Sequence, residues 1–265
     1  MTEFWNPYLQ LTDRRRRLLG AVAVVAVLAA WAAIAASGLV SRTRLPAPWD
    51  VLTALSYLAW HDGQSLLLTA TAWSAGRILV AVVLVVAVGI PLGVIMGASP
   101  SINAALSPLV DPFRSAPIVA ILPILVMWLG IGEAMKITFL FFGAVVYLVP
   151  MVRDAILAVP QNHWIGARDL GATPWECIYK AVLPMALPRI ADAVIVAVSV
   201  TWTYITVAEY VNAQEGLGQL IQNARRFSAW DQVFAGIIVI IALALVTYQL
   251  MQLAKRKLFP WETQQ

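Results

Sequence analysis

Six stretches free of charged side chains divide the sequence into apolar runs separated by polar segments. A helix needs about 20 mainly apolar residues to cross the hydrocarbon core of a bilayer. The chain shows no sustained alternation of apolar and polar residues of the kind that predicts a membrane barrel. The pattern therefore predicts an all-α integral membrane protein with six membrane-spanning helices, at residues 18–41, 78–97, 115–132, 137–152, 193–208 and 232–254.

Two segments differ from a regular span. The third run contains Pro117 and Pro123, and a proline removes a backbone donor and bends a helix, so this span should be short or kinked. Residues 51–60 are mostly apolar but too few to cross the bilayer. They predict a helix that lies at the membrane interface.

The composition supports the membrane assignment. Hydrophobic residues make up 61% of the 265 positions and charged residues 12%, with a mean hydropathy of +0.79. An ordinary soluble domain is about half apolar and a quarter charged, and a disordered chain is more polar still. Both classes are excluded. The single cysteine, Cys177, excludes a disulfide framework and favours a packing residue over a nucleophile.

The positions of lysine and arginine predict the orientation. If the N-terminus is cytoplasmic, the inner segments contain twelve of the 18 basic residues, and the reverse topology inverts that bias. Both termini should therefore be cytoplasmic, and the net charge of +4 reflects membrane topology and contact with anionic lipid, not nucleic-acid binding. The twelve are Arg14, Arg15, Arg16, Arg17, Arg114, Arg153, Arg168, Lys180, Arg189, Lys255, Arg256 and Lys257.

The first apolar run could instead belong to a cleaved signal peptide. Its apolar stretch, residues 18–34, is longer than the usual 7–15 residues, which favours a retained anchor. We expect a cytoplasmic tail at 1–17, the first span and an outer interfacial segment at 18–60, a membrane core at 61–257 and a second cytoplasmic tail at 258–265.

The segment between the fourth and fifth spans, residues 158–190, is longer than a connector requires. It shows two short amphipathic helical patterns. Thr173 can cap a second helix that starts at Pro174, and Pro184 should end that helix. The pattern alone does not distinguish a partner-binding loop from a helix that lies on the membrane surface.

The resemblance of this segment to a loop of a known protein family favours the partner-binding loop. The run Ala167-Arg168-Asp169-Leu170-Gly171-Ala172, followed by Leu183-Pro184, resembles the EAA loop of ABC importer permeases. In that family the loop forms a coupling helix that docks in a groove of the cytoplasmic ATPase. One position departs from the family motif, because Ile165 stands where the motif opens with an acidic residue.

Other stretches extend the resemblance to the nitrate, sulfonate, taurine and bicarbonate branch of these permeases. Their order and spacing carry the resemblance more than any one of them does. They are Leu45-Pro46-Ala47-Pro48, Gly89-Ile90-Pro91-Leu92-Gly93 with Gly97, residues 112–117, residues 122–133, Ala208-Glu209 and Glu215-Gly216-Leu217-Gly218.

The resemblance implies a type I, MetI-like permease fold used as a homodimer. It also implies two cytoplasmic ATPase subunits that hold ATP and Mg, and a periplasmic binding protein that delivers a small solute, such as nitrate, bicarbonate, taurine or an alkanesulfonate. Transport would proceed by alternating access. The chain itself is expected to bind no cofactor and to catalyse no reaction.

Absent motifs agree with this expectation. The sequence contains no G-x-x-x-x-G-K-[ST] phosphate-binding loop, so the energy of ATP must come from a partner. His61 and His163 are too few and too far apart for a histidine metal site, and are interpreted as exposed loop residues.

Polar residues in the fifth span mark a candidate translocation path. Ser199, Thr203, Thr206 and Tyr210 recur at helical spacing on one face, with Trp202 and Glu209 at its border. The alternative is that these hydroxyls only bond one helix to another. Glu209, at the outer end of the run, is interpreted as an interfacial residue without a burial cost, and Asp192 as the local ion-pair partner of Arg189.

Two other function classes remain open at this stage. A secondary transporter or channel would work without a cytoplasmic ATPase. A membrane-embedded enzyme is disfavoured, because the spans contain no cluster of His, Asp or Glu.

Overall fold

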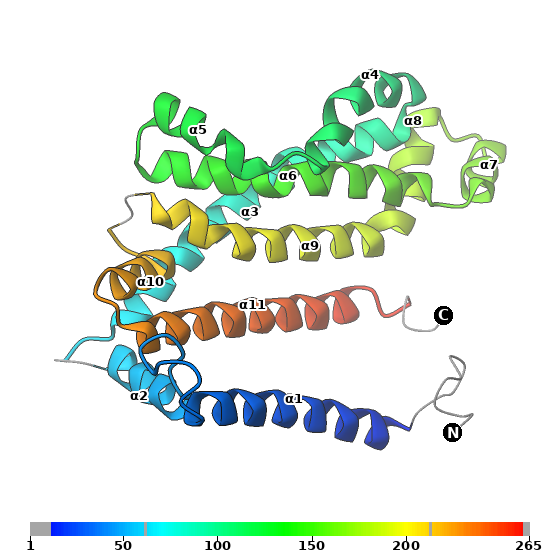
Figure 1. The fold of residues 1–265 in the computed structure, drawn as a ribbon. Helices are drawn as coiled ribbons and strands as arrows, with labels where there is room; N and C mark the ends of the chain where they lie inside the picture. Colours follow the sequence, from blue (N-terminus) through cyan, green and yellow to red (C-terminus); the bar gives the residue numbers. More distant parts are fainter. Residues whose placement is uncertain (1–11, 61–62, 212–213, 262–265) are drawn as a thin grey trace.

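The computed structural model describes residues 12–60, 63–211 and 214–261, and in these ranges helices joined by turns and loops make up the fold (Figure 1). Short 3₁₀ turns join some of the helices. The helices are α1 (Asp13–Ala36), α2 (Pro48–Ala59), α3 (Leu66–Ala98), α4 (Pro100–Val110), α5 (Leu122–Leu129), α6 (Glu133–Leu157), α7 (Gln161–Asp169), α8 (Pro174–Glu176), α9 (Leu183–Tyr210), α10 (Leu217–Arg226) and α11 (Trp230–Leu258).

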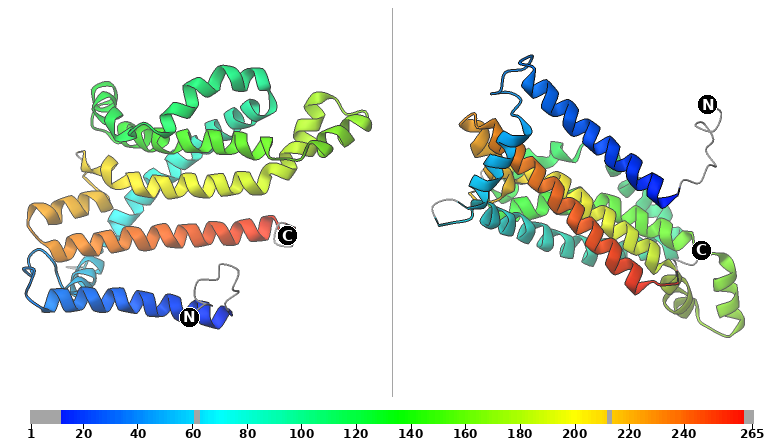
Figure 2. Two further views of the ribbon diagram at one scale, coloured as in Figure 1. Left: turned by 45° about the vertical axis from the view of Figure 1, so that its right-hand side comes forward. Right: turned by 90° about the horizontal axis from the view of Figure 1, so that it is seen from below.

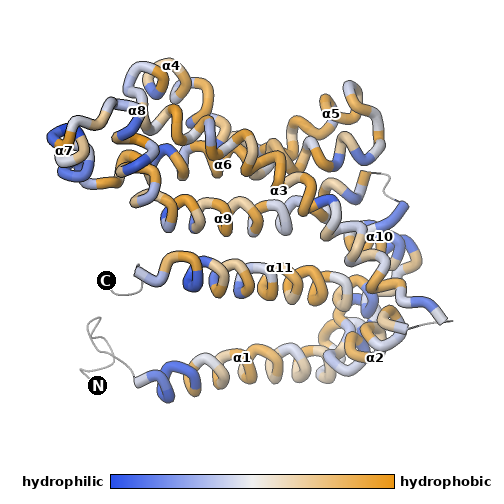
Figure 3. The backbone as a smooth tube through the Cα atoms, turned by 180° about the vertical axis from the view of Figure 1, so that it is seen from behind, coloured by the Kyte–Doolittle hydropathy of each residue, from blue (hydrophilic) through white to orange (hydrophobic). Residues whose placement is uncertain are grey.

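The long helices α1, α11, α9 and α6 run side by side, and α3 crosses behind them at a slant (Figures 1 and 2). The short helices α2 and α10 gather at one end, called here the α10 end. The helices α7 and α8 lie at the other end, the α7 end, together with the start of α1 and the end of α11. Hydrophobic residues dominate the length of the bundle and hydrophilic residues its two ends (Figure 3), which is the distribution that a bilayer requires.

Five helices are long and apolar enough to cross a membrane, and the number is six if one bent pair of helical stretches is counted as a single span. The helical stretches Pro100–Arg114 and Ile118–Leu129 meet at a bend of 96°. Asp111 contacts Arg153 near the last turn of α6, whereas Glu133, just after α5, contacts Arg77 near the opposite end. The broken pair therefore traverses the bundle, as the expected kink in the third run predicts, although its helical part already begins at Pro100.

Helices α3 and α6 form the most closely packed pair. A Cβ on Gly89, Gly93 or Gly97 would lie 2.8, 2.6 or 2.6 Å from side-chain atoms of Leu148, Val152 or Ile156, respectively. The glycines recur every four residues and therefore lie on one face. Small residues in this pattern let two membrane helices approach closely.

The first helix lies at the edge of the bundle. Ala35 is the one buried residue of α1, and Trp31 stacks on Phe234 of α11 with the ring centroids 6.0 Å apart. The Trp31 indole also donates to the carbonyl oxygen of Pro46 at 3.1 Å. α2 forms the short helix predicted at 51–60, and α1 begins at Asp13, so the basic residues 14–17 lie in its first turns.

Candidate functional site

The segment that resembles the coupling loop folds as a helix, a tight turn and a second helix. α7 ends at Asp169 with Leu170 as its C-cap, and Gly171 adopts a left-handed conformation with φ of +85°. The amide of Gly171 donates to the carbonyl of Arg168 at 2.9 Å, and that of Ala172 to the carbonyl of Ala167 at 3.1 Å. This is the Schellman arrangement, in which glycine is preferred because it lacks a Cβ.

The second helix begins as the sequence predicts. Thr173 accepts the amide of Glu176 at 3.3 Å, and the Glu176 carboxylate accepts the Thr173 amide at 2.9 Å, a reciprocal capping box. The arginine of the motif helps to close the turn, because Arg168 Nη1 donates to the carbonyl oxygen of Ala172 at 2.8 Å. Cys177 is fully buried, in agreement with a packing role.

The prediction that Pro184 ends this helix is wrong. The helix continues from Pro174 to Tyr210, and residues 177–182 form a π-helical turn directly before Pro184. In a π-helical turn, a backbone N–H donates to the carbonyl of the fifth preceding residue and not, as in an α-helix, to that of the fourth. Pro184 therefore follows a stretch in which the α-helical ladder is already interrupted, and the chain runs on into α9.

The turn between α7 and α8 projects into open space. Leu170 is 91% exposed and Trp175 67% exposed. A Cβ placed on Gly166 or Gly171 would meet no atom within 4 Å. A large apolar side chain at the tip of a rigid turn, with small residues beside it, is suited to insertion into a groove of another protein.

Of the six residues assigned to the candidate path on α9, the four on the polar face are exposed or half-buried, and the two at its border are buried. Ser199, Thr203 and Tyr210 are exposed in the single chain, and Thr206 is half-buried. Trp202, by contrast, is 6% exposed and its indole nitrogen has no hydrogen-bond partner among the described residues. The hydroxyls of Ser199 and Thr203 donate to carbonyls of their own helix, at 2.9 and 3.2 Å.

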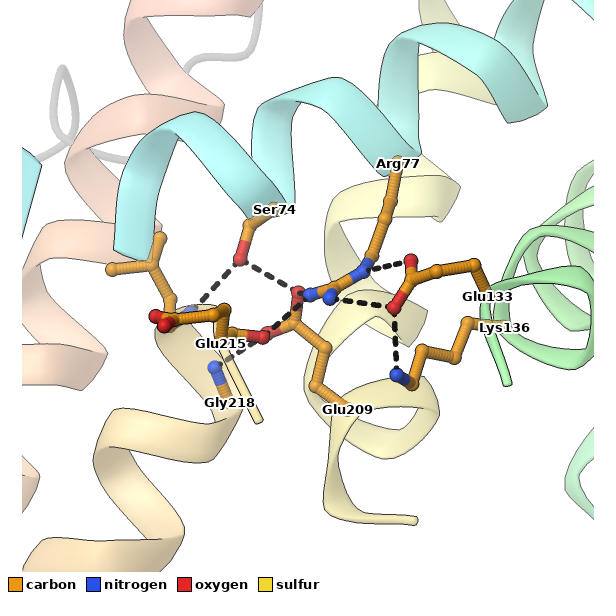
Figure 4. A network of polar contacts seen from close by, with 8 residues as sticks. Ser74, Arg77, Glu133, Lys136, Glu209, Glu215 and Gly218 are labelled. Atoms are coloured by element: carbon orange, nitrogen blue, oxygen red, sulfur yellow. Dashed lines mark hydrogen bonds and ion pairs between the residues drawn. The ribbon is translucent and has the colours of Figure 1, made fainter. Parts of the chain in front are cut away.

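The interpretation of Glu209 as an interfacial residue without a burial cost is wrong. Its side chain is 0% exposed, and Figure 4 shows it inside a network of polar contacts. The fifth apolar run ends at residue 208, directly before Glu209. At such a position, hydropathy along the chain does not distinguish a buried carboxylate from one at the surface. Its partners come from α3 and α10.

Arg77 of α3 is the centre of this network. Its Nε and Nη2 donate to the two carboxylate oxygens of Glu133 at 2.6 and 2.8 Å, a bidentate pair. Its Nη1 donates to Glu209 Oε1 and to the carbonyl oxygen of Glu215, both at 2.7 Å. Lys136 donates to Glu133 at 2.8 Å. The two cations and two carboxylates balance in charge, which makes the burial of Arg77, Lys136 and Glu209 tolerable, whereas Glu133 is 46% exposed.

The network also fixes α10 to the bundle. Ser74 donates to Glu209 at 2.7 Å and accepts the amide of Leu217 at 2.9 Å. The amide of Gly218 donates to the second oxygen of Glu209 at 2.7 Å. A Cβ on Gly216 or Gly218 would come to 2.5 or 2.8 Å from Glu209. The Glu-Gly-Leu-Gly motif therefore provides close backbone approach to a buried carboxylate.

Arg77 was not singled out by the sequence, where it counts only as one of six basic residues on the outer side. Two sequence features could have pointed to Arg77 as a buried network residue. It directly precedes an apolar run, and the Glu-Gly-Leu-Gly motif at 215–218 lies downstream. The guanidinium lies 5.6 Å from the ring centroid of Trp73. Both residues line a hollow of about 430 Å³ with Glu133.

At the α7 end, the predicted pair between Asp192 and Arg189 is wrong. Asp192 accepts from Lys255 of α11 at 2.7 Å, because α9 and α11 lie side by side and bring a residue 63 positions away into reach. Arg189 instead lines a hollow of about 330 Å³ with the half-buried His163. His61 lies outside the described residues.

Comparisons with known proteins agree with this geometry. Residues 89–260 match the family described as binding-protein-dependent transport system inner membrane component. The taurine transport system permease protein TauC of Escherichia coli K12 is 34% identical over 248 residues, which are 92% of this chain and 88% of that protein. The aliphatic sulfonates permease SsuC of Bacillus subtilis 168, a putative assignment by its own name, is 29% identical over 89% of this chain and 84% of that protein.

Solved structures confirm the fold. A chain of the inward-facing MetNI methionine ABC transporter superposes with a TM-score of 0.66 at 23% identity, covering 72% of this chain and 95% of that one. This agrees with the all-helical, MetI-like permease fold that the sequence predicts. The protein belongs to the binding-protein-dependent transport system inner membrane components, and is a multi-pass inner membrane permease subunit of ABC importers that is not itself an ATPase.

Proposed function

We propose that this permease imports a small sulfonate, such as taurine or an alkanesulfonate, through a homodimeric pore. The two relatives described above, named for taurine and for aliphatic sulfonates, support this class of substrate. The sequence resemblance also allows nitrate and bicarbonate as substrates. Both are therefore added as unlabelled competing anions in the uptake experiment below.

The α7–α8 turn is the proposed contact with the ATPase. The observation that carries this proposal is the exposure of Leu170, at 91%, on a turn whose glycine neighbours leave open space. Closure of two ATPase subunits would draw together the 158–190 segments of two permease copies. Because the chain stays helical from Pro174 through the π-helical turn at 177–182 to Tyr210, such a movement would be passed into the membrane-spanning part of α9.

The exposed face of α9 is the proposed path. Ser199, Thr203, Thr206 and Tyr210 form a polar stripe that no part of the described chain covers completely. Polar side chains within a span usually face a bundle interior or water. A second copy placed against this face would enclose the stripe between two chains.

The α7 end is proposed to face the cytoplasm, with both termini on that side, and the α10 end to face the periplasm. The domain scheme from the sequence is retained: tails at 1–17 and 258–265, a first span with its interfacial segment at 18–60, and a core at 61–257. The count of twelve inner basic residues against six outer ones supports this orientation.

Uptake into proteoliposomes tests the function. The permease is reconstituted with its ATPase, and radiolabelled taurine is offered together with the purified substrate-binding protein. We expect uptake that requires ATP and the binding protein, and that excess unlabelled alkanesulfonate suppresses more strongly than nitrate or bicarbonate. Uptake without the ATPase would instead favour a secondary transporter or channel. ATP-dependent uptake of nitrate alone would retain the importer and overturn the sulfonate assignment.

A further inference from the structure

A hollow of about 330 Å³ at the α7 end joins parts of the chain that are far apart in the sequence. Ala158 caps the end of α6, and His163 lies in the first turn of α7. Arg189 lies in the early part of α9, and Trp261 follows the end of α11. Since all four residues line the hollow, a molecule bound there would contact three helices and the segment after α11 at once.

Three of the side chains that line the hollow carry N–H groups without an acceptor. Within the described part of the chain, no hydrogen bond or ion pair involves the His163 imidazole, the Arg189 guanidinium or the Trp261 indole nitrogen. No acidic side chain of the described residues lines the hollow. The carboxylate of Asp192, one turn after Arg189, is bound by Lys255 at 2.7 Å. The hollow therefore presents donors, one of them permanently charged, and this favours an anion as its occupant.

The depth of the hollow matches the layer of lipid headgroups. The fifth apolar run begins at Ala193, four residues after Arg189, and four residues of α-helix span about 6 Å. Ala155, which also lines the hollow, lies three residues beyond the end of the fourth apolar run at Val152, about 5 Å along α6. The headgroup layer is about 5–8 Å thick on each side of the hydrocarbon core. Tryptophan, the type of Trp261, is enriched at this depth.

The hollow is separate from the tip of the turn that we assign to the ATPase. His163 and Leu170 are seven residues apart along α7, which corresponds to about 10 Å. Leu170 does not line the hollow. An occupant of the hollow therefore leaves Leu170 accessible for its proposed contact.

We propose that this hollow binds the phosphate group of an anionic phospholipid, with Arg189 and His163 donating to the phosphate oxygens and Trp261 lying beside the headgroup. Basic pockets between membrane helices are suited to such headgroups. A zwitterionic lipid has the same phosphate but adds a cationic group, which the Arg189 guanidinium would repel. A free phosphate ion offers the same acceptor oxygens, and the test separates it from the lipid. The inference goes beyond the proposed function, because it depends neither on the substrate nor on the direction of transport.

The test uses the complete permease–ATPase complex, stripped of lipid in detergent and titrated with phosphatidylglycerol or with phosphatidylcholine of the same acyl chains. The unfolding temperature and native mass spectrometry both report binding. We expect phosphatidylglycerol to stabilise the complex at lower concentration than phosphatidylcholine. Arg189→Gln should raise the phosphatidylglycerol concentration for half-maximal stabilisation at least about tenfold, which corresponds to 1.4 kcal/mol. Because Arg189 is exposed, this variant should keep the wild-type unfolding temperature without lipid. Arg189→Lys, which retains the charge, should keep most of the response.

The matched control is Arg256→Gln, which removes an exposed arginine at the same end of the bundle that does not line the hollow. It should leave the response to phosphatidylglycerol unchanged. An equal loss in Arg189→Gln and Arg256→Gln would indicate diffuse attraction to a basic surface and overturn the site, as would an unchanged response in Arg189→Gln. Inorganic phosphate that stabilises the complex and displaces phosphatidylglycerol would assign the hollow to a soluble anion and overturn the lipid. None of these results bears on sulfonate uptake, which is measured separately.

Discussion

Arg77 and Glu209 form an ion pair with 2.7 Å between Nη1 and Oε1, although 132 positions separate them in the sequence. Both side chains are withdrawn from solvent, at 4% and 0% exposure. The pair joins α3 to α9 directly beside the segment at which α10 begins. The attraction within such a pair adds little net free energy to folding, because burying both charges is costly. Removing one partner destabilises the protein strongly, because the other charge then stays buried without its counter-charge.

We therefore expect Glu209→Gln to destabilise the protein by about 3 kcal/mol, within the range seen when one member of a buried pair is removed. Thermal unfolding in detergent, followed by size-exclusion chromatography, measures the effect. Arg77→Gln combined with Glu209→Gln should cost less than the sum of the single changes, because the two residues interact directly. Additive effects would show that the pair is not coupled.

A second prediction concerns the contact between α3 and α6. Gly93→Ala should destabilise the protein, because the new Cβ would lie 2.6 Å from Val152 and 2.7 Å from the carbonyl oxygen of Val149. We expect a loss of about 1–3 kcal/mol, as overpacking of a tight core causes. Gly76→Ala, in the same helix but with no atom within 4 Å, is the control and should be neutral or slightly stabilising. Equal unfolding temperatures for both variants would contradict the close packing.

Several features were predictable because they depend on residues near one another in the sequence. Five of the six apolar runs correspond to the long helices, and Thr173 and Pro174 predict the start of the second helix because the cap and the first helical residue are adjacent in the sequence. The exposed stripe on α9 follows from helical periodicity alone. These predictions need no knowledge of the tertiary structure.

The buried network was not predictable for the opposite reason. Glu209, at the end of an apolar run, has the same local sequence whether its carboxylate meets water or Arg77. Its burial is determined by α3 and by the backbone of Gly218, which only the tertiary fold brings together. The pairing of Asp192 with Lys255 was missed likewise, because only the packing of α9 against α11 reveals it.

A third prediction concerns the path. Cysteines introduced at Ser199, Thr203 and Thr206 should react with a small membrane-impermeant thiol reagent, and their reactivity should change when nucleotide traps the ATPase. Leu245→Cys on α11 is the control, because Leu245 is 57% exposed in the single chain but would face lipid, which suppresses thiolate formation. Native Cys177 is first replaced by alanine. Equal labelling at all four positions would remove α9 from the pathway.

A fourth prediction concerns orientation. Reporter fusions after Gln265 and within residues 161–175 should both report a cytoplasmic location, and a fusion between residues 60 and 65 a periplasmic one. The positive-inside distribution of basic residues is the physical reason. A periplasmic signal from either of the first two fusions would contradict the six-span topology.

The central claim is that the exposed turn after α7 couples this permease to its ATPase, and co-purification of the two subunits measures it most directly. We predict that Gly171→Trp and Leu170→Asp abolish association with the ATPase. Leu170→Asp should keep the wild-type unfolding temperature, whereas Gly171→Trp should stay folded with a small loss of stability, because its Cβ is strained at a φ of +85°. Gly171→Asn is the matched control, because asparagine tolerates the left-handed conformation and adds little bulk; it should retain the complex. Full association of Gly171→Trp and Leu170→Asp with the ATPase would contradict the account and leave the segment as a surface loop.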